Sequence, residues 1–278
     1  MSENGRTVTI SLRNVTLAFR QNKRSSPASI LEDIDFDIHD GDFICLLGPS
    51  GCGKTSLLNI LAGYLPPTEG QITVGGKPLT GPNMEVGVVF QHPNLFPWLS
   101  VRKNVAFGLK YRNLTGAERR SIVDHYLDIV ELTDFGDLLP YQLSGGMKQR
   151  AAIARTLAVD PKIVLLDEPF SALDAMTRER MQVYAHSIWE RSGKSFFFIT
   201  HDVDEALLLG NRIMVMRGGP GMIVRDIENP LRTSPHFSRE IKRSQSFWAM
   251  RDSLLRDIEN PLLADAPNAC LSSAREAI

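Results

Sequence analysis

The sequence predicts an α/β fold built on a mainly parallel β-sheet. Short apolar runs with the length of buried strands recur along the chain, and segments with helical periodicity lie between them. Strands that alternate with helices are typical of a parallel sheet covered by helices. At the N-terminus, alternating apolar and polar residues predict antiparallel strands in addition.

The N-terminal strands are predicted over residues 6–20 and 30–38. They read "RTVTISLRNVTLAFR" and "ILEDIDFDI", and a polar turn region separates them. Alternation at a period of two, with many Val, Ile and Thr residues, is typical of strands with one buried face. We therefore expect an N-terminal antiparallel β subdomain.

The strands of the central sheet are predicted from five short apolar runs. They are "DFICLLG" (42–48), "EVGVVFQ" (85–91), "KIVLLDE" (162–168), "SFFFITHD" (195–202) and "NRIMVMRGG" (211–219). Runs of this kind fit strands that are buried on both faces.

Helices are predicted at residues 53–64, 119–132 and 177–193. In the last of these, Met181, Ala185 and Ile188 fall on one face together with Tyr184, and Gly193 follows as a helix stop. In the helix at 119–132 the predicted apolar face is Ile122, Tyr126, Ile129 and Val130. The region from about 93 to 157 is almost wholly helical in pattern, which predicts a helical subdomain inserted between strands.

Composition limits the class of protein. The 278 residues carry a formal net charge of −1, so bulk charge gives no indication of a nucleic-acid partner. The three cysteines, Cys45, Cys52 and Cys270, are too few for a disulfide framework and predict free thiols. The start lacks a signal-peptide pattern, and no apolar run approaches the roughly 18 residues that a membrane span needs. We expect a soluble protein that acts at a membrane only through a partner.

A phosphate-binding loop is predicted at residues 48–56, "GPSGCGKTS", between an apolar strand and an amphipathic helix. The loop comprises Gly48, Pro49, Ser50, Gly51, Cys52, Gly53, Lys54, Thr55 and Ser56. Glycines let backbone N–H groups point at phosphates, Lys54 places a positive charge on them, and Thr55 offers a hydroxyl to Mg²⁺. The alternative is a plain glycine turn. Within the loop, Cys52 is either a redox-sensitive thiol or a small residue that fills the turn.

Two carboxylates, Asp167 and Glu168, end a later apolar strand. Asp167 is placed to hold Mg²⁺ through water, and Glu168 can polarise an attacking water molecule. The alternative is a solvated strand end. Gln91 and His201 follow two other strands in the same way. Gln91 can reach Mg²⁺ or the water and His201 the γ-phosphate, but for each an ordinary structural role fits the sequence equally well.

A second anion-binding pattern occurs at residues 143–157, "LSGGMKQRAAIARTL". Ser144, Gly145 and Gly146 precede a helical pattern, so a hydroxyl, backbone N–H groups and a helix N-terminus come together. The chain thus contains two phosphate cradles, and sequence chemistry alone does not say why.

Over residues 7–217 the sequence resembles the ATP-binding subunits of ABC transporters, because several motifs occur in the family's order. "GPSGCGKTS" resembles the Walker A loop, Gln91 the Q-loop glutamine, and "LSGGM" the signature motif. "IVLLDE" resembles Walker B, "SALD", ending at Asp174, the D-loop, and His201 the switch histidine. Phe19 stands where the family keeps a ring that stacks on adenine.

The resemblance implies an ABC ATPase core of the P-loop NTPase fold at residues 1–218, with a short C-terminal extension at 219–278. It implies ATP and Mg²⁺ as ligands and a head-to-tail dimer. Ser144, Gly145, Gly146 and Asp174 would then serve an ATP held by the Walker A loop of the second copy, which explains the two cradles. Met147 departs from the family's usual glutamine, which puts a side-chain amide contact in doubt.

The lack of membrane segments resembles bacterial importers, in which the permease is a separate chain and a substrate-binding protein acts through it. The resemblance places such a subunit peripherally on the cytoplasmic face of the plasma membrane. Phe96, Trp98 and Leu99 either form a groove for a permease helix or pack in the core, and the resemblance favours the groove. Within the importers, the sequence is most similar to the taurine, sulfonate and nitrate group, and to taurine importers in particular.

Two other classes compete with the importer. A soluble ABC ATPase acting on nucleic acid or ribosomes usually has tandem ATPase domains or a long coiled-coil insertion, which the sequence does not show. A P-loop kinase or GTPase would leave "LSGGM" and "SALD" without a role. The heptapeptide "RDIENPL" occurs twice, at 225–231 and 256–262, and no sequence argument accounts for it.

Overall fold

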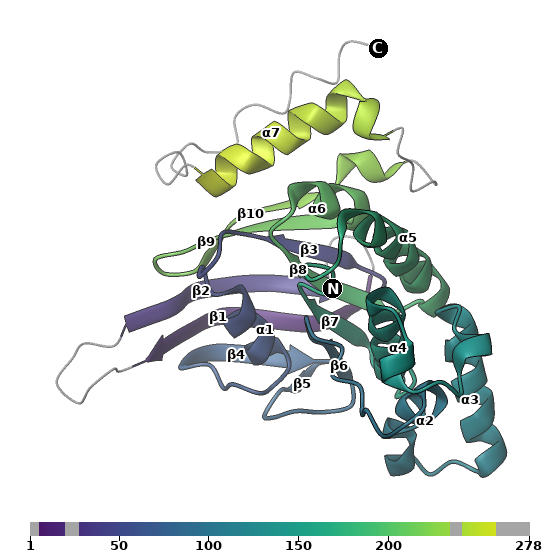
Figure 1. Ribbon diagram of the computed structural model, residues 1–278. Helices are drawn as coiled ribbons and strands as arrows, with labels where there is room; N and C mark the ends of the chain where they lie inside the picture. The colour runs from purple at the N-terminus through teal and green to yellow at the C-terminus, as the bar shows by residue number, and fades with distance from the viewer. Residues whose placement is uncertain (1–5, 20–27, 234–240, 260–278) are drawn as a thin grey trace.

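A six-stranded sheet forms the centre of the computed structural model, which describes residues 6–19, 28–233 and 241–259 (Figure 1). The strand order is β10-β9-β3-β8-β7-β6, and every neighbouring pair is parallel except β10 with β9. The strands are β3 (Phe43–Leu47), β6 (Val86–Val89), β7 (Ile163–Asp167), β8 (Ser195–Thr200), β9 (Arg212–Arg217) and β10 (Met222–Glu228). The predicted mainly parallel sheet is confirmed.

A second, antiparallel sheet has the order β2-β1-β4-β5. Its strands are β1 (Val8–Phe19), β2 (Ala28–His39), β4 (Glu69–Val74) and β5 (Lys77–Pro78). In β1 and β2 buried and exposed positions alternate, and Ile10 pairs with Ile38. The predicted N-terminal antiparallel subdomain is confirmed, and β4 and β5, which the sequence analysis did not identify, complete it.

Helices α1 (Lys54–Leu61), α5 (Ala175–Ser192) and α6 (Val203–Leu209) belong to the central α/β part of the fold. As predicted, Met181, Ala185 and Ile188 of α5 are buried. Gly193 ends α5 with φ 63°, a left-handed conformation that glycine adopts without steric cost.

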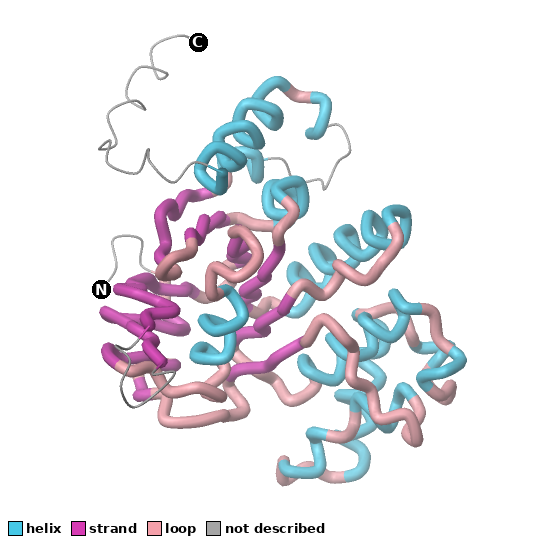
Figure 2. The backbone as a smooth tube through the Cα atoms, turned by 60° about the vertical axis from the view of Figure 1, so that its left-hand side comes forward, coloured by secondary structure: helices cyan, strands magenta, loops and turns pink. Residues whose placement is uncertain are grey.

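The helical part lies between β6 and β7 in the sequence, although these strands are neighbours in the sheet. It contains α2 (Val101–Val105), α3 (Gly116–Ile129), α4 (Gly145–Leu157) and 3₁₀ turns at Gly108–Tyr111, Thr133–Phe135 and Pro140–Gln142. Figure 2 shows these helices to one side of the molecule and the strands to the other. Of the predicted apolar face of α3, Ile129 and Val130 are buried as expected, but Ile122 and Tyr126 are half-buried. The buried positions one residue beyond them are Val123 and Leu127.

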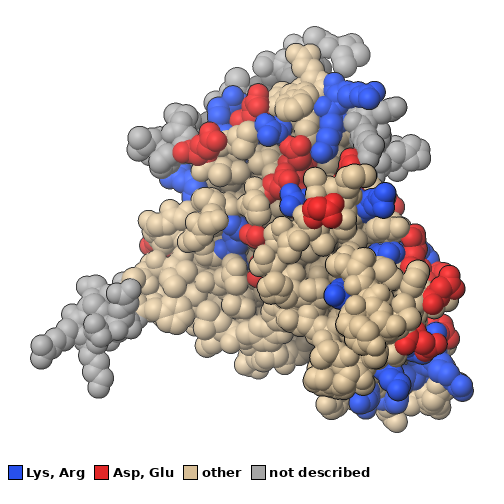
Figure 3. Space-filling view, in the orientation of Figure 1, with Lys and Arg blue, Asp and Glu red and all other residues tan. Residues whose placement is uncertain are grey.

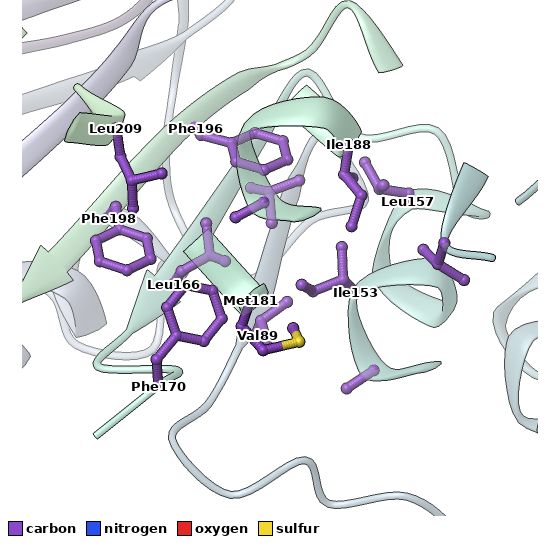
Figure 4. Packing of buried hydrophobic residues seen from close by; sticks show 14 of the residues in the cluster. Val89, Ile153, Leu157, Leu166, Phe170, Met181, Ile188, Phe196, Phe198 and Leu209 are labelled. Atoms are coloured by element: carbon purple, nitrogen blue, oxygen red, sulfur yellow. The ribbon is translucent and has the colours of Figure 1, made fainter. Parts of the chain in front are cut away.

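The core occupies both faces of the central sheet. Phe196 and Phe198 of β8 point to one face, toward α4 and α5 (Figure 4). Phe197, between them, points to the other face and stacks on Phe36 of β2 with ring centroids 6.1 Å apart. Each phenylalanine fully buried in this way contributes about 1.5–3 kcal/mol. The alternation along β8 therefore fastens the antiparallel sheet to one side of the central sheet and the helices to the other.

The C-terminal part packs on α6 through helix α7 (Gln245–Glu259), whose Phe247 and Leu254 are buried. Arg251 Nε donates a hydrogen bond to Asp204 Oδ1 of α6 at 2.9 Å. The predicted boundary at residue 218 falls inside the β9–β10 hairpin, whose second strand belongs to the central sheet.

The two copies of "RDIENPL" have different structures. The first begins in strand β10 and the second in helix α7, and the rest of the second copy lies outside the described residues. The copies also meet, because Arg225 of the first forms an ion pair with Asp257 of the second. The repeat therefore helps to hold α7 against the edge of the sheet.

Cys45 and Cys52 are buried and form no disulfide among the described residues, and Cys270 lies outside that part of the chain. In the part of the chain that the structure describes, no helix combines the length and the apolar character of a membrane span.

Candidate nucleotide-binding site

The loop of residues 48–56 joins β3 to α1 and has the backbone that a phosphate cradle needs. Gly51 and Gly53 have φ of 81° and 102°, a region that side chains disfavour. A Cβ on Gly48 would lie 2.5 Å from the carbonyl oxygen of Met216. At the start of α1, Gly53 makes no side-chain cap, so the helix N-terminus is open to an anion.

Lys54 is buried at the centre of this loop. Its Nζ donates hydrogen bonds to the carbonyl oxygens of Gly48 at 2.7 Å and Pro49 at 2.8 Å. Cys52 is also buried, and burial raises the pKa of its thiol. Because a reactive thiol needs exposure and a lowered pKa, the structure favours a small turn residue over a redox-sensitive one.

A cavity of about 560 Å³ opens beside the loop. It is lined by Ser29, Ile30, Ser50, Gly51, Gly53, Lys54, Thr55, Ser56, Glu168, Gly219 and Pro220. Two of these walls, the start of β2 and the turn between β9 and β10, were not predicted from the sequence. They are joined because the Gly221 N–H donates to the Ile30 carbonyl at 2.8 Å. The glycine-rich sequence "GGPG" at 218–221 could have indicated the turn between β9 and β10.

The carboxylates at the end of β7 have different environments. Burial, and then the neighbouring charge of Glu168, raises the pKa of Asp167, and Lys54 opposes the shift. Glu168 leaves the strand with φ 42°, a left-handed conformation uncommon for a residue with a side chain. Its N–H donates to the Ile199 carbonyl at 3.1 Å, and its own carbonyl accepts from Ser171 N and Oγ. Backbone strain held in place by such bonds is typical of functional sites.

Gln91 and His201 both approach Glu168. His201 Nδ1 lies 3.2 Å from Glu168 Oε2. Gln91 Nε2 donates to Ser171 Oγ at 2.8 Å, and that hydroxyl bonds the Glu168 carbonyl. The three predicted residues follow β6, β7 and β8, which are adjacent in the sheet. Parallel strands end at one edge, which is why they meet. Ser171, the link between two of them, was missed.

The second cradle does not line the cavity. Ser144 caps α4, and its Oγ accepts a hydrogen bond from Met147 N at 3.3 Å, which leaves the hydroxyl proton available. Asp174 caps α5 in the same way, accepting from Thr177 N at 3.0 Å. The two helix starts are neighbours, since a Cβ on Gly146 would touch Thr177 and Met181 of α5. Ser144, Gly145 and Asp174 are exposed there.

Phe19 ends β1, pairs with Ala28 and is 46% exposed. It lies outside the lining of the cavity, although β2 continues from Ala28 directly to the wall residues Ser29 and Ile30. An exposed ring beside a cavity wall can stack on a base.

The chemistry of three predicted donors fits Mg²⁺, and of the three Thr55 lines the cavity whereas Gln91 and Asp167 do not. The exposed Thr55 hydroxyl, the Gln91 amide and the Asp167 carboxylate are hard oxygen donors of the kind this ion prefers. A cation would also stabilise the ionised form of Asp167, which burial and Glu168 disfavour. Among the described residues no group of three or more His, Cys, Asp or Glu side chains could hold a metal by itself, so phosphate oxygens or water would have to complete the coordination.

The fold and the site define a nucleoside-triphosphate-binding protein, and comparison with known proteins specifies its family. The family model described as ABC transporter matches residues 31–171. The chain belongs to this family as one of its ATP-binding ATPases, whose hydrolysis of ATP is coupled to transport. This match confirms the family that the sequence motifs predicted.

Three similar proteins illustrate the match. The taurine import ATP-binding protein TauB of Roseobacter denitrificans is 43% identical over 94% of this chain and 98% of its own. The nitrate import ATP-binding protein NrtD of Synechocystis is 46% identical over 85% and 91%. The ATP-binding cassette MJ0796, solved as a dimer bound to ADP and Pi, has a TM-score of 0.66 and 34% identity, over 79% of this chain and 98% of its own.

Proposed function

We propose that this chain is the ATP-hydrolysing subunit of a membrane importer for taurine or a related sulfonate. The observation that carries the proposal is the similarity to a taurine import protein over nearly the whole of both chains. The nitrate import relative is as similar over a somewhat shorter span, so nitrate or another small anion is the second candidate.

In this proposal ATP occupies the cavity beside the phosphate loop. Backbone N–H groups of residues 48–56 and the Lys54 ammonium bind the phosphates, and Phe19 stacks on adenine. Thr55, Gln91 and Asp167 would hold Mg²⁺, which when bound neutralises charge on the phosphate oxygens.

Glu168 polarises the water molecule that attacks the γ-phosphorus. The water oxygen forms a bond to phosphorus as its proton passes to the Glu168 carboxylate, the bond to the β–γ bridging oxygen breaks, and ADP and phosphate leave. His201, whose Nδ1 lies 3.2 Å from Glu168 Oε2, would hold that carboxylate in place and contact the γ-phosphate. Glu168 is exposed enough to meet water, yet its backbone is held at both N–H and carbonyl.

The second cradle serves a second copy of the chain. Ser144, Gly145 and Asp174 are exposed at two neighbouring helix starts, buried Gly146 lies beside them, and none of the four lines the cavity of its own chain. In a head-to-tail dimer they would close over the partner's ATP, so ATP binding draws the subunits together and hydrolysis releases them.

Cross-linking tests the dimer. In a Cys270→Ser background with Glu168→Gln, cysteines at Ser50 and Ser144 should form a disulfide between chains only when Mg-ATP is present. Cys45 and Cys52 are buried and should stay silent. The control pair joins Ser50 with the exposed Ser121 of α3 and should stay uncross-linked. A disulfide within one chain, or none at all, would refute the arrangement.

An aromatic surface on the helical part is proposed as the permease contact. Trp98 is 72% exposed, and its ring lies 5.7 Å from that of half-buried Phe96. Buried Asn104 fixes the loop, since it bonds the N–H and carbonyl of Phe96 and the carbonyl of Leu99. A rigid, exposed aromatic pair suits an apolar helix of the permease. On the face drawn in Figure 3, acidic and basic residues are intermixed, and this face shows no extended basic patch of the kind that binds nucleic acid.

The subunit would thus sit peripherally on the cytoplasmic face of the plasma membrane, and a substrate-binding protein would act through the permease. The test purifies tagged Glu168→Gln from native membranes in mild detergent with Mg-ATP, where a polytopic permease should co-purify. A deletion strain should lose growth on taurine as sulfur source and keep growth on nitrate as nitrogen source. Recovery of ribosomes or DNA would refute the importer, and loss of growth on nitrate alone would favour the second candidate.

A further inference from the structure

Glu205 of α6 is a buried carboxylate outside the phosphate loop. The residue is 5% exposed, and among the described residues it forms no salt bridge with a lysine or arginine, although the charge of Arg178 acts on it. Burial raises the pKa of this carboxyl. An acidic group in such a place costs free energy unless its hydrogen bonds are satisfied. The hydrogen-bond partners of the Glu205 carboxylate therefore indicate its role.

The two carboxylate oxygens join two different elements. Oε2 accepts a hydrogen bond from Thr200 Oγ1 at the end of β8, at 2.6 Å, and Oε1 accepts from Gln182 Nε2 of α5, at 3.1 Å. The Thr200 oxygen in turn accepts from the N–H of Asp202 at 3.0 Å. One carboxylate thus fixes the residue before His201 and, through it, the residue after His201.

His201 depends on this support because its own side chain is poorly held. The side chain of His201 is 58% exposed, and its Nδ1 contacts Glu168 Oε2. The direction of the imidazole therefore follows from the backbone at residues 200–202. We propose that Glu205 is a positioning residue that aims His201 at Glu168 and at the reacting phosphate. This inference rests on the catalytic role proposed for His201.

The test is a double-mutant cycle on steady-state ATP hydrolysis with His201→Ala, Glu205→Ala and the double variant. Glu205→Ala should lower kcat by roughly 10- to 100-fold, as expected for a misplaced catalytic group, with the KM for ATP little changed. In the His201→Ala background, Glu205→Ala should have no further effect, because there is no imidazole left to position. A merely structural role would instead lower the activity of both backgrounds by the same factor.

Two variants guard against misfolding. Glu205→Gln keeps the volume and one acceptor and should restore much of kcat, and Thr200→Val breaks the same network at its other end and should repeat the non-additivity. Asp204→Ala is the matched control: it removes the adjacent carboxylate, which bonds Arg251 of α7, and should lower Tm but leave kcat unchanged.

The outcomes of the cycle distinguish failure of the positioning role from failure of the proposed function. Multiplicative losses in the double variant, or parental kcat in Glu205→Ala, would overturn the positioning role while leaving the proposed function intact. Parental kcat in His201→Ala would instead remove the catalytic role of His201, and with it the basis of this inference.

Discussion

The turn between β9 and β10 supports the phosphate loop through close backbone contact, and Gly221→Ala tests this support. A Cβ at Gly221 would lie 2.3 Å from the Cys52 carbonyl oxygen, 2.7 Å from Met216 Cε and 3.0 Å from the Ile30 carbonyl oxygen. Ordinary van der Waals contact begins near 3.4 Å. The Met216 side chain can move, but the two carbonyls belong to the phosphate loop and to the start of β2.

The added methyl group must push the Cys52 carbonyl away by about 1 Å, the difference between 2.3 and 3.4 Å. Overpacking of this kind costs about 1–3 kcal/mol. For a chain of this size each kcal/mol shifts Tm by roughly 2–4 °C, so we expect a fall of about 2–12 °C. Because Cys52 lies inside the phosphate loop, the KM for ATP should rise as well.

The assay pairs thermal unfolding, with and without Mg-ATP, with steady-state hydrolysis. Gly81→Ala is the control, since a Cβ there would meet nothing within 4 Å and the backbone has no positive φ. It should keep parental Tm and KM. If Gly221→Ala also keeps both, the turn does not support the loop and the close packing at Cys52 is without consequence.

Three other predictions concern separate parts of the molecule. Glu168→Gln should hydrolyse ATP roughly 10²- to 10⁴-fold more slowly while binding it, as measured by single-turnover hydrolysis and equilibrium binding, and parental turnover would refute the base assignment. Trp98→Ala should weaken association with the permease by roughly 30-fold, the equivalent of an interface residue worth about 2 kcal/mol, and leave the ATPase activity of the free subunit unchanged; unchanged association would place the contact elsewhere. The Glu118 carboxylate accepts hydrogen bonds from Thr115, which lowers its pKa. Its contribution to stability is therefore present above its unfolded-state pKa and is lost as the pH falls through the lower folded value. Glu118→Ala should be less stable than the parent in chemical denaturation at pH 7 and equally stable near pH 2.

Five of the six central strands could be predicted from the sequence because a strand buried on both faces leaves a continuous apolar run, whereas the edge strand β10 is half exposed and was not predicted. The end of α5 could be predicted because Gly193 is the residue that a left-handed stop favours. Strands β4 and β5 could not, since β4 is half exposed and β5 has only two residues. Strand β4 is positioned by pairing with β1, a tertiary contact, and β5 by pairing with β4.

In the site, too, some features could be predicted from the sequence and others could not. Residues at strand ends, such as Gln91, Glu168 and His201, could be placed together because parallel strands end at one edge. The left-handed backbone of Glu168 left no trace in the residue type, since glutamate seldom adopts it. The cavity walls at Ile30 and Gly219–Pro220 were missed because residues distant in sequence meet there through backbone hydrogen bonds, which any residue with an N–H group can make.

Helix α5 connects the two parts of the proposed composite site. Asp174 caps its start beside the second cradle, and Gln182, eight residues later, bonds the carboxylate that supports His201. At 1.5 Å per residue these positions are about 12 Å apart along one rigid helix. In the proposed dimer, a partner subunit that pressed on Asp174 would therefore also press on the support of His201. If the proposed dimer forms, its closure and the alignment of His201 with Glu168 would be linked within each chain, and removal of one buried hydrogen bond of the Glu205 network should separate them.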